Sequence, residues 1–92
     1  MKLDDVKIGQ IVIDKYGNEY VVEIADNHKL RPVLLKCIKF LNIVRVQKIG
    51  DVKFHNVNDS FWIYKSAEVA MFDGCDLECI TVKSLKLKGV SK

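Results

Sequence analysis

The stretch KIGQIVIDKYGNEYVVEIA, residues 7–25, predicts an antiparallel β-hairpin. Apolar residues rich in Val and Ile alternate with polar ones, or form short runs, on both sides of a polar centre, as in half-buried strands. We expect strands at residues 7–14 and 19–25. The joining residues include Gly17 and Asn18, which tolerate the positive φ that a tight reversal needs. The hairpin therefore favours a β domain.

The rest of the chain continues this β pattern. VLLKCIKF at 33–40 and IVRVQKI at 43–49 predict two strands that pair as a second hairpin across Leu41 and Asn42. VKFHNV and FWIY extend the β character, with polar breaks between them. LECITVKSLKLK is expected to be the final strand, whose exposed edge is protected by three lysines, Lys83, Lys86 and Lys88.

One segment is ambiguous between helix and strand. Ser66 is suited to cap a short helical turn that covers residues 67–69, but residues 67–72 also alternate as a strand does. We favour a brief helical turn that runs into a strand.

Five or six short strands with almost no helix predict one all-β, mainly antiparallel domain over residues 1–92. A small barrel or a strongly bent sheet is expected, because closure removes exposed edges in so short a chain. VKIGQIVIDKYGNEYVVEI resembles the opening hairpin of small SH3-like barrel proteins of bacteria and phages, in which an apolar–Gly–polar–apolar strand precedes a glycine turn and EYVV. The resemblance implies an SH3-like barrel and no particular function.

The composition is that of an ordinary globular protein, with 49% hydrophobic and 29% charged residues. No apolar run approaches the roughly 20 residues that span a membrane, and the first ten residues lack the apolar core of a signal peptide. We therefore expect a cytoplasmic protein. The odd number of cysteines, three, favours free buried thiols over a disulfide framework.

Charge is distributed unevenly along the chain. Residues 1–26 hold three basic and six acidic side chains, a net charge of −3. Residues 27–58 hold seven basic and one acidic side chain, a net charge of +6, whereas residues 66–79 hold four acidic side chains and no basic one. The middle segment is therefore the part suited to a polyanionic partner.

The candidate binding residues are the basic side chains of this middle segment and two aromatic ones: Lys29, Arg31, Lys36, Lys39, Arg45, Lys48, Lys53, Trp62 and Tyr64. Strand alternation places Lys39 opposite Lys36, and Arg45 opposite Lys48, so only a twisted wall with basic loops could gather four or five of the cations. The alternative is that the lysines simply keep a β surface soluble.

Aromatic side chains in or near the basic segment would stack on bases if they were exposed, and these are Phe40, Phe54, Phe61, Trp62 and Tyr64. In FWIY, alternation separates Phe61 and Ile63 from Trp62 and Tyr64. One pair is therefore expected in the core and the other near the surface.

Metal and catalytic sites have weaker support. Cys75 and Cys79, with His28 and His55, could complete a tetrahedral zinc site, but three intervening residues differ from a CxxC knuckle, so we expect inward-pointing thiols and no metal. Cys37 lies in an apolar run, where a thiol is normally inert. No phosphate-binding glycine loop or catalytic carboxylate pair is present, and we expect neither an enzyme nor a cofactor.

The sequence thus predicts a non-catalytic binding module whose basic middle segment engages nucleic acid or a nucleoprotein. The alternative is a small phage-type protein–protein module, either an inhibitor of a host defence protein or a component that self-assembles through its oppositely charged sides. The partner would then be a larger host or phage protein, or a second copy of the chain.

Overall fold

A computed structural model describes residues 1–26, 30–41, 45–49, 51–54, 57–72 and 80–90, with the backbone alone for 45–49 and 51–54. In these residues the structure has seven strands, one short α-helix and two 3-10 turns. In order they are η1 (Leu3–Asp5), β1 (Gln10–Ile13), β2 (Glu19–Ala25), β3 (Val33–Lys39), β4 (Arg45–Ile49), β5 (Asp51–Phe54), β6 (Ser60–Ile63), α1 (Ala67–Phe72), η2 (Val82–Ser84) and β7 (Lys86–Val90).

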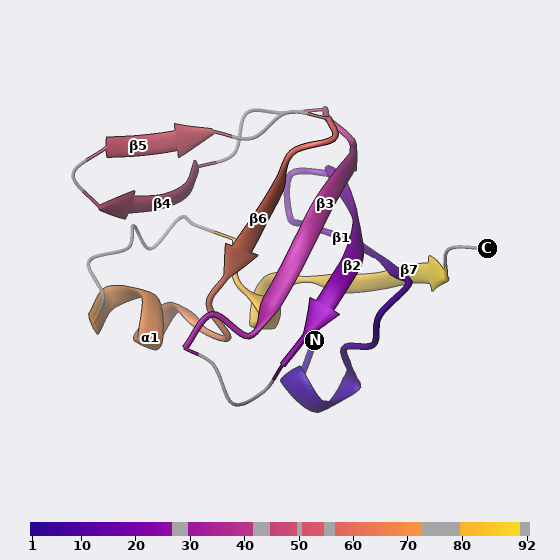
Figure 1. Cartoon of the computed structure of the whole chain (residues 1–92), viewed down its shortest axis with the longest axis horizontal. Helices are drawn as coiled ribbons and strands as arrows, with labels where there is room; N and C mark the ends of the chain where they lie inside the picture. Colours follow the sequence, from indigo (N-terminus) through magenta and orange to yellow (C-terminus); the bar gives the residue numbers. More distant parts are fainter. Residues whose placement is uncertain (27–29, 42–44, 50, 55–56, 73–79, 91–92) are drawn as a thin grey trace.

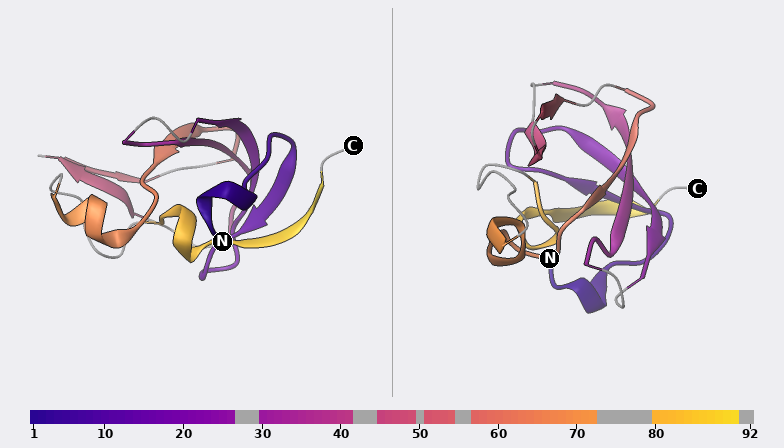
Figure 2. Two further views of the ribbon diagram at one scale, coloured as in Figure 1. Left: turned by 90° about the horizontal axis from the view of Figure 1, so that it is seen from below. Right: turned by 60° about the vertical axis from the view of Figure 1, so that its left-hand side comes forward.

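Five strands form one antiparallel sheet in the order β6-β3-β2-β1-β7, and β4 pairs with β5 in a separate two-stranded sheet. The predicted all-β, antiparallel fold is confirmed. Strands β6, β3 and β2 run side by side, whereas β7 crosses behind them at a steep angle, so the sheet is strongly bent (Figure 1). The β4–β5 hairpin lies beside this sheet rather than within it, which is also visible from the two sides in Figure 2.

The predicted first hairpin is confirmed, with Ile11 opposite Val21 and Ile13 opposite Glu19. Its turn uses one positive φ, 89° at Gly17. A Cβ on Gly17 would lie 3.2 Å from Leu41 Cδ1, a tight contact that Leu41 would have to relieve, but the positive φ is the main reason for glycine here. Asn18 contributes its side chain to the turn instead of a positive φ.

Asp14 holds this turn from beneath. Its Oδ1 accepts hydrogen bonds from the backbone N–H groups of Tyr16 (2.8 Å) and Asn18 (3.1 Å). Its Oδ2 accepts from Asn18 Nδ2 (3.1 Å) and from the Tyr20 hydroxyl. Asn18 Oδ1 in turn accepts from the backbone N–H of Leu41 (2.7 Å). Because Asp14, Asn18 and Tyr20 are all buried, the network supplies partners for polar groups that water does not reach.

The predicted pairing of 33–40 with 43–49 is wrong. Strand β3 pairs with β2 on one side and β6 on the other, and β4 pairs with β5. A local hairpin would use one edge of the 33–40 strand, whereas the central position uses both edges and buries Val33 and Leu35 completely. Long-range burial therefore decides the strand order.

The last predicted strand is too long. Residues 82–84 form the 3-10 turn η2, and β7 begins only at Lys86. The turn is closed reciprocally, since the Thr81 backbone N–H donates to Ser84 Oγ (3.0 Å) and the Ser84 N–H donates to the Thr81 carbonyl (3.0 Å). The helical turn expected at 67–69 is confirmed by α1, which continues to Phe72. The strand expected after it lies outside the described residues.

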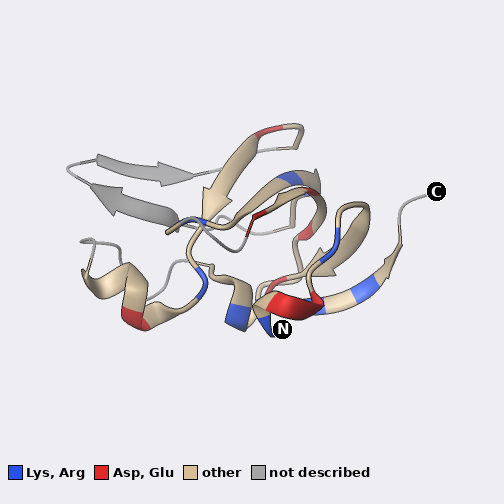
Figure 3. Cartoon of the chain, turned by 60° about the horizontal axis from the view of Figure 1, so that its bottom comes forward, with Lys and Arg blue, Asp and Glu red and all other residues tan. Residues whose placement is uncertain are grey.

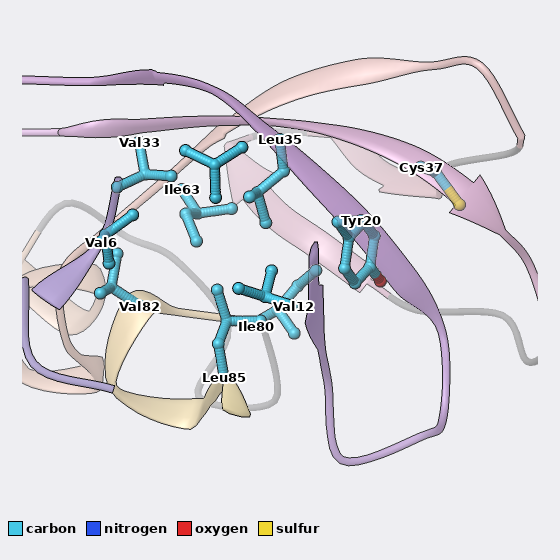
Figure 4. Close-up of a cluster of buried hydrophobic side chains, with 11 residues drawn as sticks. Val6, Val12, Tyr20, Val33, Leu35, Cys37, Ile63, Ile80, Val82 and Leu85 are labelled. Atoms are coloured by element: carbon cyan, nitrogen blue, oxygen red, sulfur yellow. The ribbon is translucent and has the colours of Figure 1, made fainter. Parts of the chain in front are cut away.

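The core fills the concave side of the bent sheet. Val33, Leu35 and Ile63 project from β3 and β6 towards Ile80 and Leu85, which come from the chain segment before β7 (Figure 4). Tyr20 packs its ring edge-to-face against Phe61, with the ring centroids 5.6 Å apart. No helix in the described part of the chain is long and apolar enough to cross a membrane.

Candidate functional site

The convex side of the five-stranded sheet is called the outer face below. Val33, Leu35 and Cys37 point into the core, so alternation turns Leu34 and Lys36 outward. Lys36 lies opposite Val21 on β2 and opposite Ser60 on β6. Because β3 is the second strand of the sheet, Lys36 stands well inside this face and away from its edges.

A β-bulge brings Lys39 to the same face. The register shifts so that Tyr20 opposes Cys37 but Glu19 opposes Lys39, which leaves Ile38 as the extra residue. Strict alternation predicted Lys39 on the face opposite Lys36, and that expectation is wrong because of the bulge. Lys39 Nζ lies 3.6 Å from Glu19 Oε2.

A second bulge, on β7, brings Lys88 to the outer face. Ile13 opposes Lys86 and Val12 opposes Leu87, but Ile11 opposes Gly89, so Lys88 is the extra residue. Lys88 Nζ lies 2.7 Å from Glu19 Oε1. Lys86 shares the outward side of Ile13, and the two cations therefore join the outer face from its far edge.

Glu19 sits between the two bulged strands. Its side chain is 11% exposed, whereas those of Lys39 and Lys88 are 56% and 51% exposed. The hydrogen bond from Lys88 holds the pKa of Glu19 below its ordinary value, helped by the charges of Lys88 and Lys39 and opposed by burial. Glu19 is thus an ionised group that pairs with two lysines whose side chains stay about half exposed.

We call Lys36, Lys39, Lys86 and Lys88 the lysine face. Its nearby carboxylates are Glu19 and Glu23, and Glu23 accepts a hydrogen bond from the Ser60 hydroxyl across β3. Four cations against two carboxylates leave the surface positive. Figure 3 shows basic positions along β7 and the acidic turn η1 drawn beside the start of that strand.

Trp62 lies beside the lysine face. It opposes Leu34 on β3, and Leu34 opposes Ile24 on β2, so the three apolar side chains form a row across the outer face. Trp62 and Leu34 are half-buried and Ile24 is exposed. An indole ring next to lysines is an arrangement suited to bases and phosphates together.

The structure brings Arg31 and Tyr64 together, and the two side chains contact each other instead of facing a ligand side by side. The guanidinium carbon lies 5.0 Å from the Tyr64 ring centroid, and Arg31 Nη2 donates to the Tyr64 hydroxyl (2.8 Å). Tyr64 is buried beside Ala70 of α1. Its ring is therefore not presented to a base, and the expectation that it shares the surface with Trp62 is wrong because α1 covers it.

The remaining predicted cations lie apart from the lysine face. Arg45 belongs to β4, with Phe54 as its partner position, and Lys48 is opposite Val52. Lys53 belongs to β5 of the same separate hairpin. Lys29 lies outside the described residues. The structure thus divides the basic segment between two sheets.

The other aromatic candidates do not join Trp62. Phe61 and Phe40 pack against the core. For Phe61 this means that the Phe61 and Ile63 side of FWIY is the inner one. The side chain of Phe54 is not described. Trp62 is thus the aromatic candidate that the described side chains place on the outer face.

The metal hypothesis falls on residues that are not described: His28, His55, Cys75 and Cys79. Among the residues that are described, no group of three His, Cys, Asp or Glu side chains is placed to hold a metal ion. Cys37 is a free, buried thiol, as expected. Burial, the largest cause, raises the pKa of Cys37 and keeps the thiol protonated.

Lys86 and Lys88 were assigned to edge protection by the sequence pattern, and the structure adds them to the candidate site. They lie some 50 residues from Lys36 and Lys39 in sequence and meet them only through the β1–β7 pairing. The available signal was weak: two lysines flanking one apolar residue in KLK.

No family model, curated protein or solved structure matches the chain. The resemblance of residues 6–24 to SH3-like barrels stays a prediction.

Proposed function

We propose that the protein is a non-catalytic binding module that holds nucleic acid by its phosphates on the lysine face. One observation carries the proposal: two β-bulges turn Lys39 and Lys88 onto the outer face, beside Lys36 and Lys86. Lysines at this density attract phosphates of any sequence, because each contact releases counterions. The function is therefore backbone binding without sequence readout.

Glu19 acts on binding in two opposing ways, by ordering two lysines and by adding a negative charge. The Glu19 carboxylate lies 3.6 Å from the Lys39 ammonium and 2.7 Å from the Lys88 ammonium, and each lysine side chain stays about half exposed. A cation that is already ordered loses less side-chain entropy when a phosphate binds. Glu19 thus pre-organises the surface at the cost of one opposing charge.

The test is the salt dependence of binding to a single-stranded thymidine 20-mer. The triple variant Lys36→Gln, Lys39→Gln and Lys86→Gln keeps the Lys88–Glu19 bridge. Its slope of log K against log salt should fall by about 2, since each single-strand phosphate contact contributes about 0.7. The matched control changes three exposed lysines outside the sheet, Lys2, Lys7 and Lys65, to Gln. The control should keep the slope of the unmodified protein.

Absence of binding by the unmodified protein at low salt would reject the proposal. An equal loss in both triple variants would show that net charge, and not the lysine face, governs affinity.

A protein partner is the second candidate, and a different surface favours it. Phe72, at the end of α1, is 97% exposed, and Met71 beside it is 60% exposed. Large apolar side chains in water commonly mark protein contacts. If α1 is a contact, Phe72→Ser should abolish any concentration-dependent increase in mass measured by analytical ultracentrifugation. A constant monomer mass in the unmodified protein would remove the self-assembly version.

A further inference from the structure

Resting on the proposed function, we infer that the nucleic acid is single-stranded and that one of its bases stacks on Trp62. The lysine face by itself would accept any phosphate chain. The inference rests on the row formed by Trp62, Leu34 and Ile24. Phosphates alone would not contact these apolar side chains, whereas the bases of a single strand would.

The geometry sets the ligand's path. Trp62 lies opposite Leu34, and Lys36 and Lys39 follow Leu34 along β3. At about 3.3 Å per residue, Lys36 is about 7 Å and Lys39 about 16 Å from the Trp62 row. A strand whose base rests on Trp62 thus has its phosphates led over Lys36 towards the lysines around Glu19. The footprint is on the order of 4 nucleotides, the lower end of the site sizes of small single-strand binding folds.

A duplex fits this surface less well. Its bases are stacked on one another and expose only their edges, in grooves that a protruding helix or ribbon enters. Trp62 lies on the edge strand β6, half-buried beside Leu34 of β3, so its ring does not protrude into a groove as a recognition helix or ribbon would. A duplex would therefore touch the lysines and leave the apolar row in water.

Two of the other described aromatic side chains lie elsewhere: Phe61 is turned into the core against Tyr20, and Tyr64 is buried beside α1. Trp62 is the single tryptophan of the chain, so fluorescence excited at wavelengths that tyrosine does not absorb reports this ring alone. Its emission provides a direct readout of stacking.

The experiment compares four ligands with the full-length protein at one low salt concentration. These are a thymidine 12-mer, a 12-mer of abasic sites with the same phosphates, a 12-base-pair duplex and poly-glutamate. We expect the thymidine 12-mer to bind about tenfold more tightly than the abasic strand and to quench the fluorescence of Trp62. The duplex and poly-glutamate should leave that emission unchanged.

Two variants separate stacking from packing. Trp62→Phe keeps an aromatic ring, whereas Trp62→Leu keeps apolar volume beside Leu34 without a ring. Trp62→Leu should lose about tenfold in affinity for the thymidine strand, as expected for one stacked base, and nothing for the abasic strand. Trp62→Phe should retain most of the affinity. Circular dichroism and the unfolding midpoint establish that each variant is folded, and fluorescence anisotropy of a labelled strand replaces the lost tryptophan signal.

Equal affinity for the thymidine and abasic strands would overturn the inference and leave the proposed function in place. Tighter binding of poly-glutamate than of either strand would overturn it in favour of an acidic protein partner. If no nucleic acid binds at all, the proposed function fails, and the inference fails with it.

Discussion

The two faces of the five-stranded sheet follow different rules. On the inner face, Val12, Val22 and Leu35 are buried. On the outer face, alternation fails at Glu23, Ile38 and Lys88, and the failures at Ile38 and Lys88 bring lysines close to Glu19. The regular face builds the fold, whereas the irregular face gathers charge.

This difference indicates where function is encoded. A β-bulge leaves one residue unpaired and re-aims side chains, and bulges are frequent beside functional sites. At two of the bulges the re-aimed lysine, Lys39 or Lys88, forms an ion pair with Glu19. Surface ion pairs contribute little to stability, about 0–1 kcal/mol. We therefore expect inner-face changes to act on stability and outer-face changes to act on binding.

The largest effect is expected at Asp14, whose carboxylate accepts four hydrogen bonds beneath the first turn. Asp14→Ala leaves these buried donors without an acceptor and should lower the free energy of unfolding by about 4 kcal/mol. Urea denaturation followed by circular dichroism measures it. The exposed Asp5→Ala is the control, with an expected change below about 0.5 kcal/mol. A loss at Asp14 no larger than that of the control would contradict the role of this network.

Neighbouring leucines on β3 test the two faces directly. Leu35 is completely buried on the inner face, whereas Leu34 is half-buried on the outer one. Leu35→Ala should cost about 3 kcal/mol of stability, because it opens a cavity in the core. Leu34→Ala should cost about 1 kcal/mol and should weaken binding of the thymidine strand by removing the neighbour of Trp62. Urea denaturation measures both losses. Equal losses for Leu35→Ala and Leu34→Ala would contradict the different roles of the two faces.

A smaller effect is expected from the substitution of Glu19, which should raise the affinity for nucleic acid and lower the stability of the fold. Glu19→Gln removes the negative charge beneath Lys39 and Lys88, so affinity for the thymidine strand should rise about threefold at low salt. The variant should also be slightly less stable at neutral pH, because the carboxylate is paired in the fold.

The pH dependence of this loss follows from the sign of the shift. The pKa of Glu19 is lowered in the fold, so its contribution to stability is present above the ordinary pKa and disappears as the pH falls through the lowered one. The difference in unfolding free energy between Glu19→Gln and the unmodified protein should therefore narrow from about pH 5 downward. A difference that stays constant down to pH 2 would show that the ion pairs do not account for it.

The first hairpin could be predicted because its information is local. Alternation, a glycine turn and a polar centre lie within residues 7–25; β2 has the predicted bounds, whereas β1 is shorter than predicted and covers only Gln10–Ile13. The role of Asn18 could not be predicted, since its amide oxygen binds the backbone of Leu41, more than 20 residues away. The strand order could not be predicted either, because the choice between pairing 33–40 with its sequence neighbour or with β2 and β6 depends on long-range burial.

The candidate site could be predicted only in part. Lys36, Lys39 and Trp62 were among the candidates, and the structure brings them to one face. The segment charges were misleading, however, because Glu19 comes from the acidic beginning of the chain and lies among lysines from its middle and end. Bulges have no clear signature in this sequence, and so the positions of Lys39 and Lys88 required the three-dimensional pairing.

The central claim is that the outer face, and not the β4–β5 hairpin or α1, binds nucleic acid. The most direct measurement is a titration of the ¹⁵N-labelled protein with a thymidine 12-mer, followed by amide and indole chemical shifts. We predict that the largest shifts occur at Lys36, Lys39 and Lys88 and at the indole N–H of Trp62, with little change at the buried Val12. Shifts confined to residues 45–54 or to α1, with the lysine face unaffected, would contradict the account.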